Sequence, residues 1–184
     1  MIRRLALAAV LALPAACGQK SDAVRPPPHT LTPAAVGHFC GMVVEEHEGP
    51  KGQILLKGRQ EPVWFTSARD AIAFTLLPEE PRDIAAVYVS DMAKAQSWAH
   101  PGPDDWVEAH DASFVLGSSR RGGMGGAEAV PLSDPAAAQR FAGEYGGRVV
   151  RLDQIPSDYI LGGSGPGGGD AAAGPEAGAA GAEK

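Results

Sequence analysis

The sequence predicts an α+β fold in which a strand, a helix and a strand follow one another twice. This order is predicted within residues 53–89 and again within residues 112–152. A shift of 67 positions superposes residues 61–67 on residues 128–134 and aligns the helices and strands that follow. Self-similarity of this kind is typical of repeated units. We therefore expect two small lobes, at about residues 37–92 and 93–161, that face a shared cleft.

The first 16 residues have the features of a cleaved export signal. Arg3 and Arg4 precede an apolar run of about nine residues, which is too short to span a membrane as a permanent helix. Small residues then precede Cys17, as they do at bacterial lipoprotein processing sites. We expect Cys17 to become a lipidated first residue, with ordinary cleavage and a free thiol as the alternative. Gly18 after it favours a periplasmic location at the outer membrane, by similarity to bacterial sorting patterns.

Composition limits what the mature chain can do. Removal of residues 1–16 leaves 14 Lys and Arg against 22 Asp and Glu, and the resulting charge of −8 argues against a nucleic-acid partner. Residues 17–36 are polar and Pro-rich, and we expect them to form an extended spacer. Residues 162–184 are rich in Gly and Ala, and we expect a disordered tail. The working part is then the core at residues 37–161.

Local patterns predict the elements of this core. Residues 38–44 combine aromatic and β-branched side chains, so they are predicted to form a strand that pairs as a hairpin with a strand at 53–57. Ser67 is the predicted N-cap of a helix that ends at Pro78. Further strands are predicted at 84–89, 112–117 and 148–152, and a second helix at 134–145.

The cysteines give the first chemical clue. If Cys17 carries lipid, Cys40 has no partner within the chain, and an unpaired thiol in an oxidising compartment needs an explanation. On a strand, the side chains of His38, Cys40 and Met42 would share one face. Thiolate and thioether are soft ligands that suit Cu(I), whereas zinc sites seldom use Met, and Mg and Ca sites prefer oxygen. We therefore expect a Cu(I) site at Cys40 and Met42, with His38 as a candidate further ligand.

A third sulfur ligand must come from another part of the chain. Met124 lies in a glycine-rich stretch, residues 118–126, where a methionine would have little to pack against. Met92 follows a predicted strand and is a second candidate, although that position suits a packing methionine equally well. Met124 is the favoured ligand, and two lobes would place it across the cleft from Cys40.

Together these features resemble the NosL family. Besides the leader and the spacer, the resemblance rests on GHFCGM at 37–42, PVWFTSARD at 62–70, YVSDM at 88–92 and RRGGM at 120–124. It covers about residues 30–161 and implies two lobes of ββαβ type, similar to organomercurial lyases. It also implies that Cys40, Met42 and Met124 bind Cu(I). The implied role is to supply copper for the centres of nitrous-oxide reductase, together with an ABC-type membrane complex.

The residues leave two alternatives open. One is a lyase-like enzyme with Cys40 as nucleophile and His38, His100 or His110 as its base. Because fold similarity is weak support for an activity and the core holds one thiol, we expect no catalytic function. The other is an envelope lipoprotein that binds no metal, docks through Arg120 and Arg121 and keeps Cys40 buried and inert.

Overall fold

The computed structural model describes residues 25–162. The expected signal peptide, Cys17 and all but the first residue of the expected tail lie outside these residues. Within the described range, none of the helices has the length and apolar character needed to cross a membrane.

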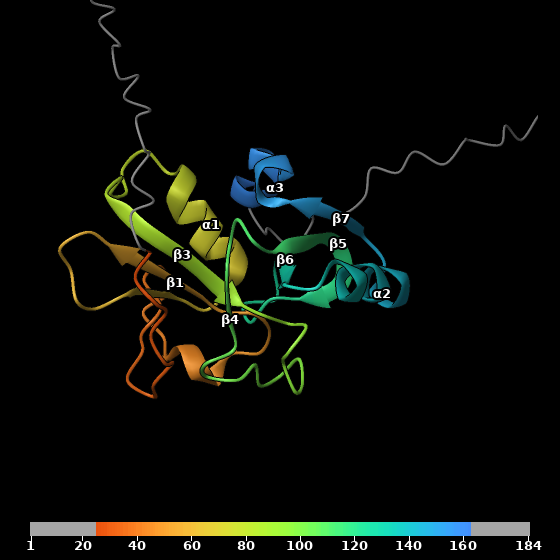
Figure 1. Cartoon of the computed structure of the whole chain (residues 1–184), viewed down its shortest axis with the longest axis horizontal. Coiled ribbons are helices and arrows are strands. Elements are labelled where there is room, and N and C mark those ends of the chain that lie inside the picture. Colours follow the sequence, from red (N-terminus) through yellow and green to blue (C-terminus); the bar gives the residue numbers. More distant parts are fainter. Residues whose placement is uncertain (1–24, 163–184) are drawn as a thin grey trace, which may run out of the picture.

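Two antiparallel sheets with helices packed against them make up the described chain (Figure 1). The first sheet has the strand order β2-β1-β3-β4, and the second has the order β6-β5-β7. The strands are β1 Gly52–Leu56, β2 Val63–Phe65, β3 Ile84–Ser90, β4 Trp106–Glu108, β5 Ser113–Arg121, β6 Ala127–Leu132 and β7 Arg148–Arg151. The helices are α1 Ala68–Leu76, α2 Pro135–Tyr145 and α3 Ser157–Leu161, with short 3-10 turns η1 Val44–Glu46 and η2 Leu152–Gln154.

Both sheets contain the same ββαβ unit. In the first sheet the strands lie side by side in the order β2-β1-β3, and in the second in the matching order β6-β5-β7. Along the chain, α1 connects β2 to β3 and α2 connects β6 to β7. The mixed fold with antiparallel sheets is confirmed, and the matching strand order supports the expected duplication. Strand β4 pairs with β3 and so extends the first sheet beyond residue 92, the expected end of the first lobe.

The helices begin where local chemistry predicts. The Ser67 side chain caps α1 by accepting a hydrogen bond from the backbone N–H of Asp70 at 3.0 Å. Asp134 caps α2 in the same way, accepting from the N–H of Ala136 at 2.9 Å. Such caps satisfy amide groups that have no partner within the helix.

The two units share one hydrophobic core. Ile54 and Val87 of the first sheet, Phe114 and Val150 of the second, and Phe74 of α1 belong to a single buried cluster. Strand β1 is buried along its whole length because α1 covers one face of the first sheet and the N-terminal segment covers the other. The shared core fixes the position of each unit against its neighbour.

Residues 38–44 do not form the predicted strand. The N–H of Gly41 donates to the carbonyl oxygen of Gly37, and the N–H of Gly37 donates to the carbonyl oxygen of Met42, both at 2.8 Å. These two hydrogen bonds close a tight turn. Gly41 has a φ of 68°, a conformation that glycine adopts readily and that interrupts an extended strand. The predicted hairpin with 53–57 is therefore wrong as well, since β1 pairs with β2 and β3.

Two other segments differ from expectation. Strand β5 continues to Arg121, so the stretch at 118–126 is reduced to a hairpin turn at 122–126. Residues 25–35, expected to lie in a spacer, pack on the first sheet instead. Leu31 and Ala35 are buried there because the apolar outer face of the sheet needs a cover, so the core begins before residue 37.

We predict that Gly52→Ala destabilises the fold, because β1 and α1 approach closely at this residue. A Cβ at Gly52 would lie 2.4 Å from the Cβ of Ala71, so the helix or the strand must shift. Overpacking of this kind should lower the free energy of unfolding by about 1–3 kcal/mol in a denaturant titration. Gly143→Ala in α2 is the matched control, because a Cβ there meets no atom within 4 Å. Equal stability of the two variants would contradict the close packing.

Candidate metal centre

The cysteine turn, residues 37–42, holds Cys40 near the start of α1. The Cys40 Sγ lies 3.7 Å from the Thr66 Oγ1, one residue before the N-cap. A Cβ on Gly37 would lie 2.7 Å from the same sulfur, so glycine is needed for the thiol to sit there. Cys40 is a free thiol of intermediate exposure, which disagrees with the alternative of a buried, inert cysteine.

The methionine loop, residues 122–126, connects β5 to β6. The N–H of Gly125 donates to the carbonyl oxygen of Gly122 at 2.8 Å, and the N–H of Gly122 donates to that of Gly126 at 3.0 Å. Met124 stands at the tip of this turn with 54% of its surface exposed. The turn is thus closed by its own backbone hydrogen bonds, while its methionine side chain remains accessible.

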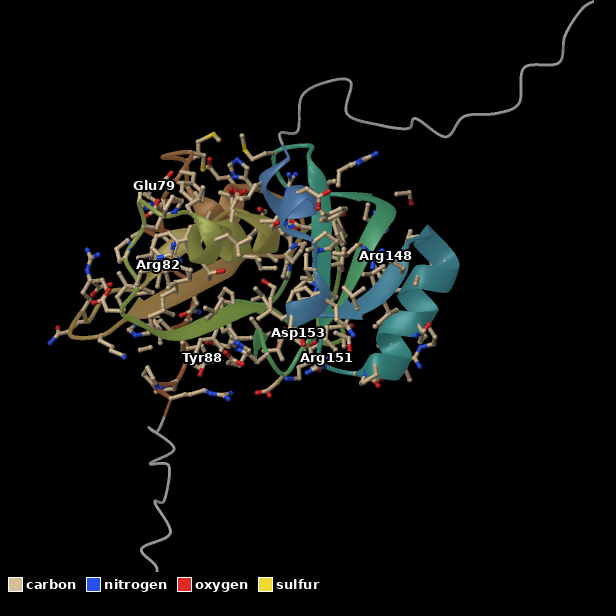
Figure 2. All side chains as sticks on the ribbon, turned by 90° about the horizontal axis from the view of Figure 1, so that it is seen from above. Glu79, Arg82, Tyr88, Arg148, Arg151 and Asp153 are labelled. Carbon is tan, nitrogen blue, oxygen red and sulfur yellow. The ribbon has the colours of Figure 1, made fainter. Side chains whose placement is uncertain are left out.

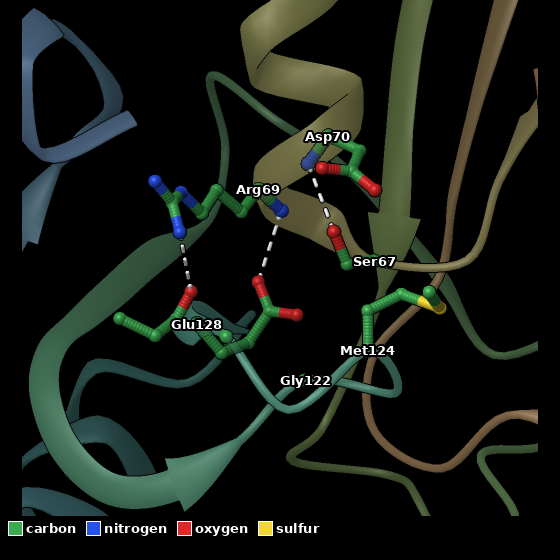
Figure 3. Close-up of a pocket in the computed structure, with 8 residues that line it drawn as sticks. Ser67, Arg69, Asp70, Gly122, Met124 and Glu128 are labelled. Carbon is green, nitrogen blue, oxygen red and sulfur yellow. Dashed lines mark hydrogen bonds between the residues drawn. The ribbon is translucent and has the colours of Figure 1, made fainter. Parts of the chain in front are cut away.

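The methionine loop reaches the start of α1 from the second sheet. Met124 lies near Ser67 in Figure 3, and both residues line the same small pocket. Cys40 contacts Thr66, which directly precedes Ser67. The cysteine turn and the methionine loop, which are far apart in the sequence, therefore both lie beside the start of α1.

A second contact connects the methionine loop with the chain that follows the cysteine turn. A Cβ on Gly123 would lie 2.6 Å from the Cβ of His47 and 2.9 Å from the carbonyl oxygen of Glu48, so the two backbones are closely packed. The His47 Nδ1 lies 3.1 Å from the carbonyl oxygen of Val43, the residue after Met42. Met42 is itself exposed at 37%.

The pocket beside Met124 has a volume of about 70 Å³. It lies between the start of α1 and the methionine loop (Figure 3). Its lining residues are Ser67, Arg69, Asp70, Gly122, Met124, Gly126, Ala127 and Glu128. The pocket is therefore formed by both ββαβ units.

Glu128 forms the buried wall of this pocket. Its Oε1 accepts hydrogen bonds from the backbone N–H groups of Arg69 at 2.9 Å and Ala129 at 2.8 Å. Its Oε2 has no hydrogen-bond partner among residues 25–162 and lies 2.7 Å from where a Cβ on Gly122 would be. Burial raises the pKa of Glu128 to about 8, although the two N–H donors oppose the shift. Burial also raises the pKa of Asp70.

Lys51 supports the segment on which the methionine loop rests. It is almost fully buried, and its Nζ donates to the carbonyl oxygens of His47 and, at 3.0 Å, of Glu48. Burial lowers the pKa of Lys51 to about 8, against the opposing effect of the Glu128 and Glu48 carboxylates. The ammonium group thus fixes the backbone that Gly123 touches.

His38 does not share a strand face with Cys40 and Met42, because the strand is absent. Its Nε2 lies 3.0 Å from the Glu80 Oε1. The imidazole ring also contacts Phe39 and Phe74, at centroid distances of 5.0 and 5.4 Å. These contacts occupy one ring nitrogen of the candidate ligand.

Met92 lies in a packing position. It is partly buried against a cluster that contains Val115, Val130 and Leu132, and its N–H donates to the carbonyl oxygen of Pro131 at 3.0 Å. This environment is that of a core methionine of the second sheet. The arrangement favours Met124 over Met92 as the third sulfur ligand.

The described residues offer no arrangement for a hard metal or a histidine-activated thiol. No group of three or more His, Cys, Asp and Glu side chains among residues 25–162 could hold a metal ion. Cys40 hydrogen-bonds to Thr66 and not to a histidine, while His110 lies 2.9 Å from Glu108 through its Nδ1. Of the two arginines of the docking alternative, Arg120 packs over the rings of Tyr145 and Trp98, whereas Arg121 is exposed.

Sequence reasoning missed the charged residues around the site. Glu128 interrupts an otherwise apolar strand, and this is the signal that could have identified it. Lys51 directly precedes the fully buried strand β1, which is a weaker signal. His47 lies between glutamates in the sequence, which gives no signal of a site, and its contact with the methionine loop depends on the tertiary fold.

Comparison with known proteins gives consistent matches. The family model described as NosL matches residues 28–160. The copper-binding lipoprotein NosL of Achromobacter cycloclastes is 43% identical over 162 residues, which cover 87% of this chain and 83% of the relative. The protein of the same name from Stutzerimonas stutzeri is 32% identical over 144 residues, covering 76% and 72%. These relatives are named for copper binding and not for an enzymatic activity.

A solved structure agrees with the fold. The crystal structure of the copper chaperone NosL from Shewanella denitrificans superposes with a TM-score of 0.66 at 36% sequence identity. The match covers 71% of this chain and 97% of that one.

We predict that Glu128→Gln flattens the pH dependence of stability. The folded carboxyl has a pKa of about 8 against an ordinary value of 4.5, so across this range the unfolded chain has lost a proton that the folded chain keeps. Stability should therefore fall as pH rises, by at most about 1.4 kcal/mol per pH unit. The amide of the Glu128→Gln variant does not titrate, so this contribution to the pH dependence of stability is lost. The measurement is urea unfolding of the reduced, metal-free domain between pH 5 and pH 7.5.

The exposed residue Glu144 on α2 provides the control for this experiment. Glu144→Gln should keep the wild-type slope. If Glu128→Gln also kept it, the Glu128 carboxyl would not be the group that titrates.

Proposed function

Because the chain belongs to the NosL family, we propose that it is a periplasmic Cu(I)-binding metallochaperone that supplies copper for maturation of the centres of nitrous-oxide reductase. The observation that carries the proposal is the convergence of the cysteine turn and the methionine loop at the start of α1. Cys40, Met42 and Met124 are the proposed ligands. Its relatives named copper-binding lipoprotein and copper chaperone support the cargo.

The type of donor favours the reduced ion. One thiolate and two thioethers form a soft set of ligands, which prefers Cu(I) to zinc or to metals that need oxygen ligands. The lack of a His, Cys, Asp and Glu cluster among the described residues agrees with this preference. A fourth position can be taken by solvent, by an imidazole or by a ligand of the receiving protein.

The exposure of the ligands suits a carrier that must release its cargo. Met42 and Met124 keep 37% and 54% of their surface exposed, and Phe39 and Val36 beside them keep 45% and 50%. An incoming ligand can therefore reach the metal without prior unfolding of the domain. The exposed apolar residues also form a surface on which a partner can pack.

The proposed location follows from the leader and from the relatives' names. Cys17 would carry the lipid that anchors the protein, and Gly18 favours the outer membrane. The proposed partners are nitrous-oxide reductase and its ABC-type assembly complex. Nucleic acid is not a proposed partner, because the mature chain is acidic.

We predict that single methionine variants identify the ligands. Met42→Leu and Met124→Leu should each lower Cu(I) affinity at least about tenfold, equal to 1.4 kcal/mol, in an anaerobic competition with a Cu(I) chelator. Each should also lose one sulfur neighbour in X-ray absorption, and Cys40→Ser should abolish stoichiometric binding. Met92→Leu is the matched control, because it conserves volume in a packing position. Loss of a sulfur neighbour in Met92→Leu but not in Met124→Leu would overturn the ligand assignment.

We predict that Gly123→Ala weakens copper binding although it removes no ligand. The added Cβ would collide with His47 and with the backbone of Glu48, so the methionine loop must shift relative to the segment that follows the cysteine turn. Cu(I) affinity should fall about tenfold in the same competition. Gly143→Ala should leave the affinity unchanged, and circular dichroism should show that both variants are folded. Wild-type affinity in a folded Gly123→Ala variant would contradict the role of this contact.

A further inference from the structure

Residues 25–31, here called the strap, are bound along the outer face of the first sheet. The Arg25 guanidinium pairs with Glu108 at 3.3 Å and Asp111 at 3.2 Å. The Tyr88 hydroxyl donates to the carbonyl oxygen of Pro26 at 2.8 Å. The strap therefore begins on the edge of the molecule where these side chains lie.

The strap is built into the fold. The side-chain amide of Gln53 is fully buried, and it both accepts from the N–H of His29 and donates to its carbonyl oxygen, each at 2.8 Å. Thr30 donates to Asp104 at 2.6 Å, and Leu31 is buried in the cluster on this face. Since leaving a buried amide without partners is costly, detaching this part of the strap would destabilise the sheet.

The strap begins on the edge of the molecule opposite the proposed copper site. In Figure 2, Tyr88 and Asp153 lie in the lower half of the view, whereas Glu79 and the yellow sulfur atoms lie in the upper part. The hydrogen bond from Tyr88 to Pro26 places the start of the strap in the lower half. The contact of His38 with Glu80 places the cysteine turn beside Glu79, in the upper part.

The bound strap shortens the connection to the proposed anchor. Arg25 follows Cys17 by eight positions, which span at most about 29 Å, whereas a free chain from Cys17 to Gly37 would span up to about 70 Å. A compact domain of the described size is about 35 Å across. A connection shorter than the domain cannot let it turn over and bring its far edge to the bilayer.

We propose that the strap orients the anchored protein, with the edge of Tyr88 and Asp153 facing the lipid surface and the copper site facing away from it. This inference rests on the proposed lipidation of Cys17. A recipient of copper would then approach from the side remote from the membrane that carries the anchor.

The test compares two labels on lipidated protein in vesicles of 3:1 phosphatidylethanolamine and phosphatidylglycerol. Glu79 and Asp153 are both exposed and acidic, so Glu79→Cys and Asp153→Cys, each in a Cys40→Ser background, carry the same fluorophore. A short-range quencher is placed on a fraction of the lipid headgroups. Given a domain about 35 Å across, the label at position 153 should be quenched at least about threefold more strongly than the label at position 79.

Two further variants test the cause of the orientation. A six-residue Gly-Ser insertion between Val24 and Arg25 lengthens the connection to about 50 Å and should make the two labels equally quenched. Arg25→Gln combined with Tyr88→Phe should reduce the difference as well. This double variant frees the chain as far as His29, which allows about 43 Å.

The quenching results test the orientation separately from copper binding. Equal quenching of the two labels in the parent protein would overturn the orientation, and so would an unchanged difference after the insertion. A mature protein that fails to float with vesicles would overturn the anchoring on which the proposal rests. Cu(I) titration of the unlabelled protein tests the proposed function independently of these results.

Discussion

The amino end of α1 is the point that joins the two sheets. Glu128 in β6 accepts the backbone N–H of Arg69, and the Arg69 guanidinium donates to the carbonyl oxygens of Ala127 and Ile160. Burying a carboxyl and a guanidinium is costly unless hydrogen bonds replace their water, and here the bonds reach three separate segments of the chain. These contacts fix one ββαβ unit against the other and offset part of the cost of burial, while the Glu128 Oε2 has no hydrogen-bond partner among residues 25–162. Any site formed between the units depends on this junction.

The proposed metal centre lies at this junction and depends on it for support. The start of α1 supplies no sulfur, but it gives the cysteine turn and the methionine loop a common support at Thr66 and Ser67. Backbone hydrogen bonds close both turns, so the chain segments that carry the proposed ligands are already folded before a metal binds. The exposed ends of Met42 and Met124 keep the centre open on one side. A centre built in this manner combines a fixed backbone with accessible donors.

Sequence patterns predicted those parts of the fold that depend on local chemistry. Ser67 and Asp134 mark the starts of α1 and α2 because capping is decided within one turn of chain. The cysteine turn could not be predicted, because its β-branched and aromatic residues match a strand and the positive φ of Gly41 is set by contacts with Gly37. The sulfur ligands proposed at Cys40, Met42 and Met124 rest on the donor chemistry of their side chains, which the sequence alone supplies. The burial of Lys51 and Glu128 has only a weak signal in the apolar strands beside or around them, since charged side chains are ordinarily exposed and these two are enclosed by distant segments.

The hydrogen-bonded turn that carries Met124 has a consequence for how quickly this proposed ligand can move. Exposed side chains hop between rotamers within picoseconds to nanoseconds, whereas loop rearrangements take nanoseconds to microseconds or longer. Because the turn at 122–126 is closed by its own backbone hydrogen bonds, swinging the thioether aside requires rotation about side-chain bonds alone. If Met124 binds the metal as proposed, its thioether could leave the ion on the timescale of side-chain motion, without a rearrangement of the loop.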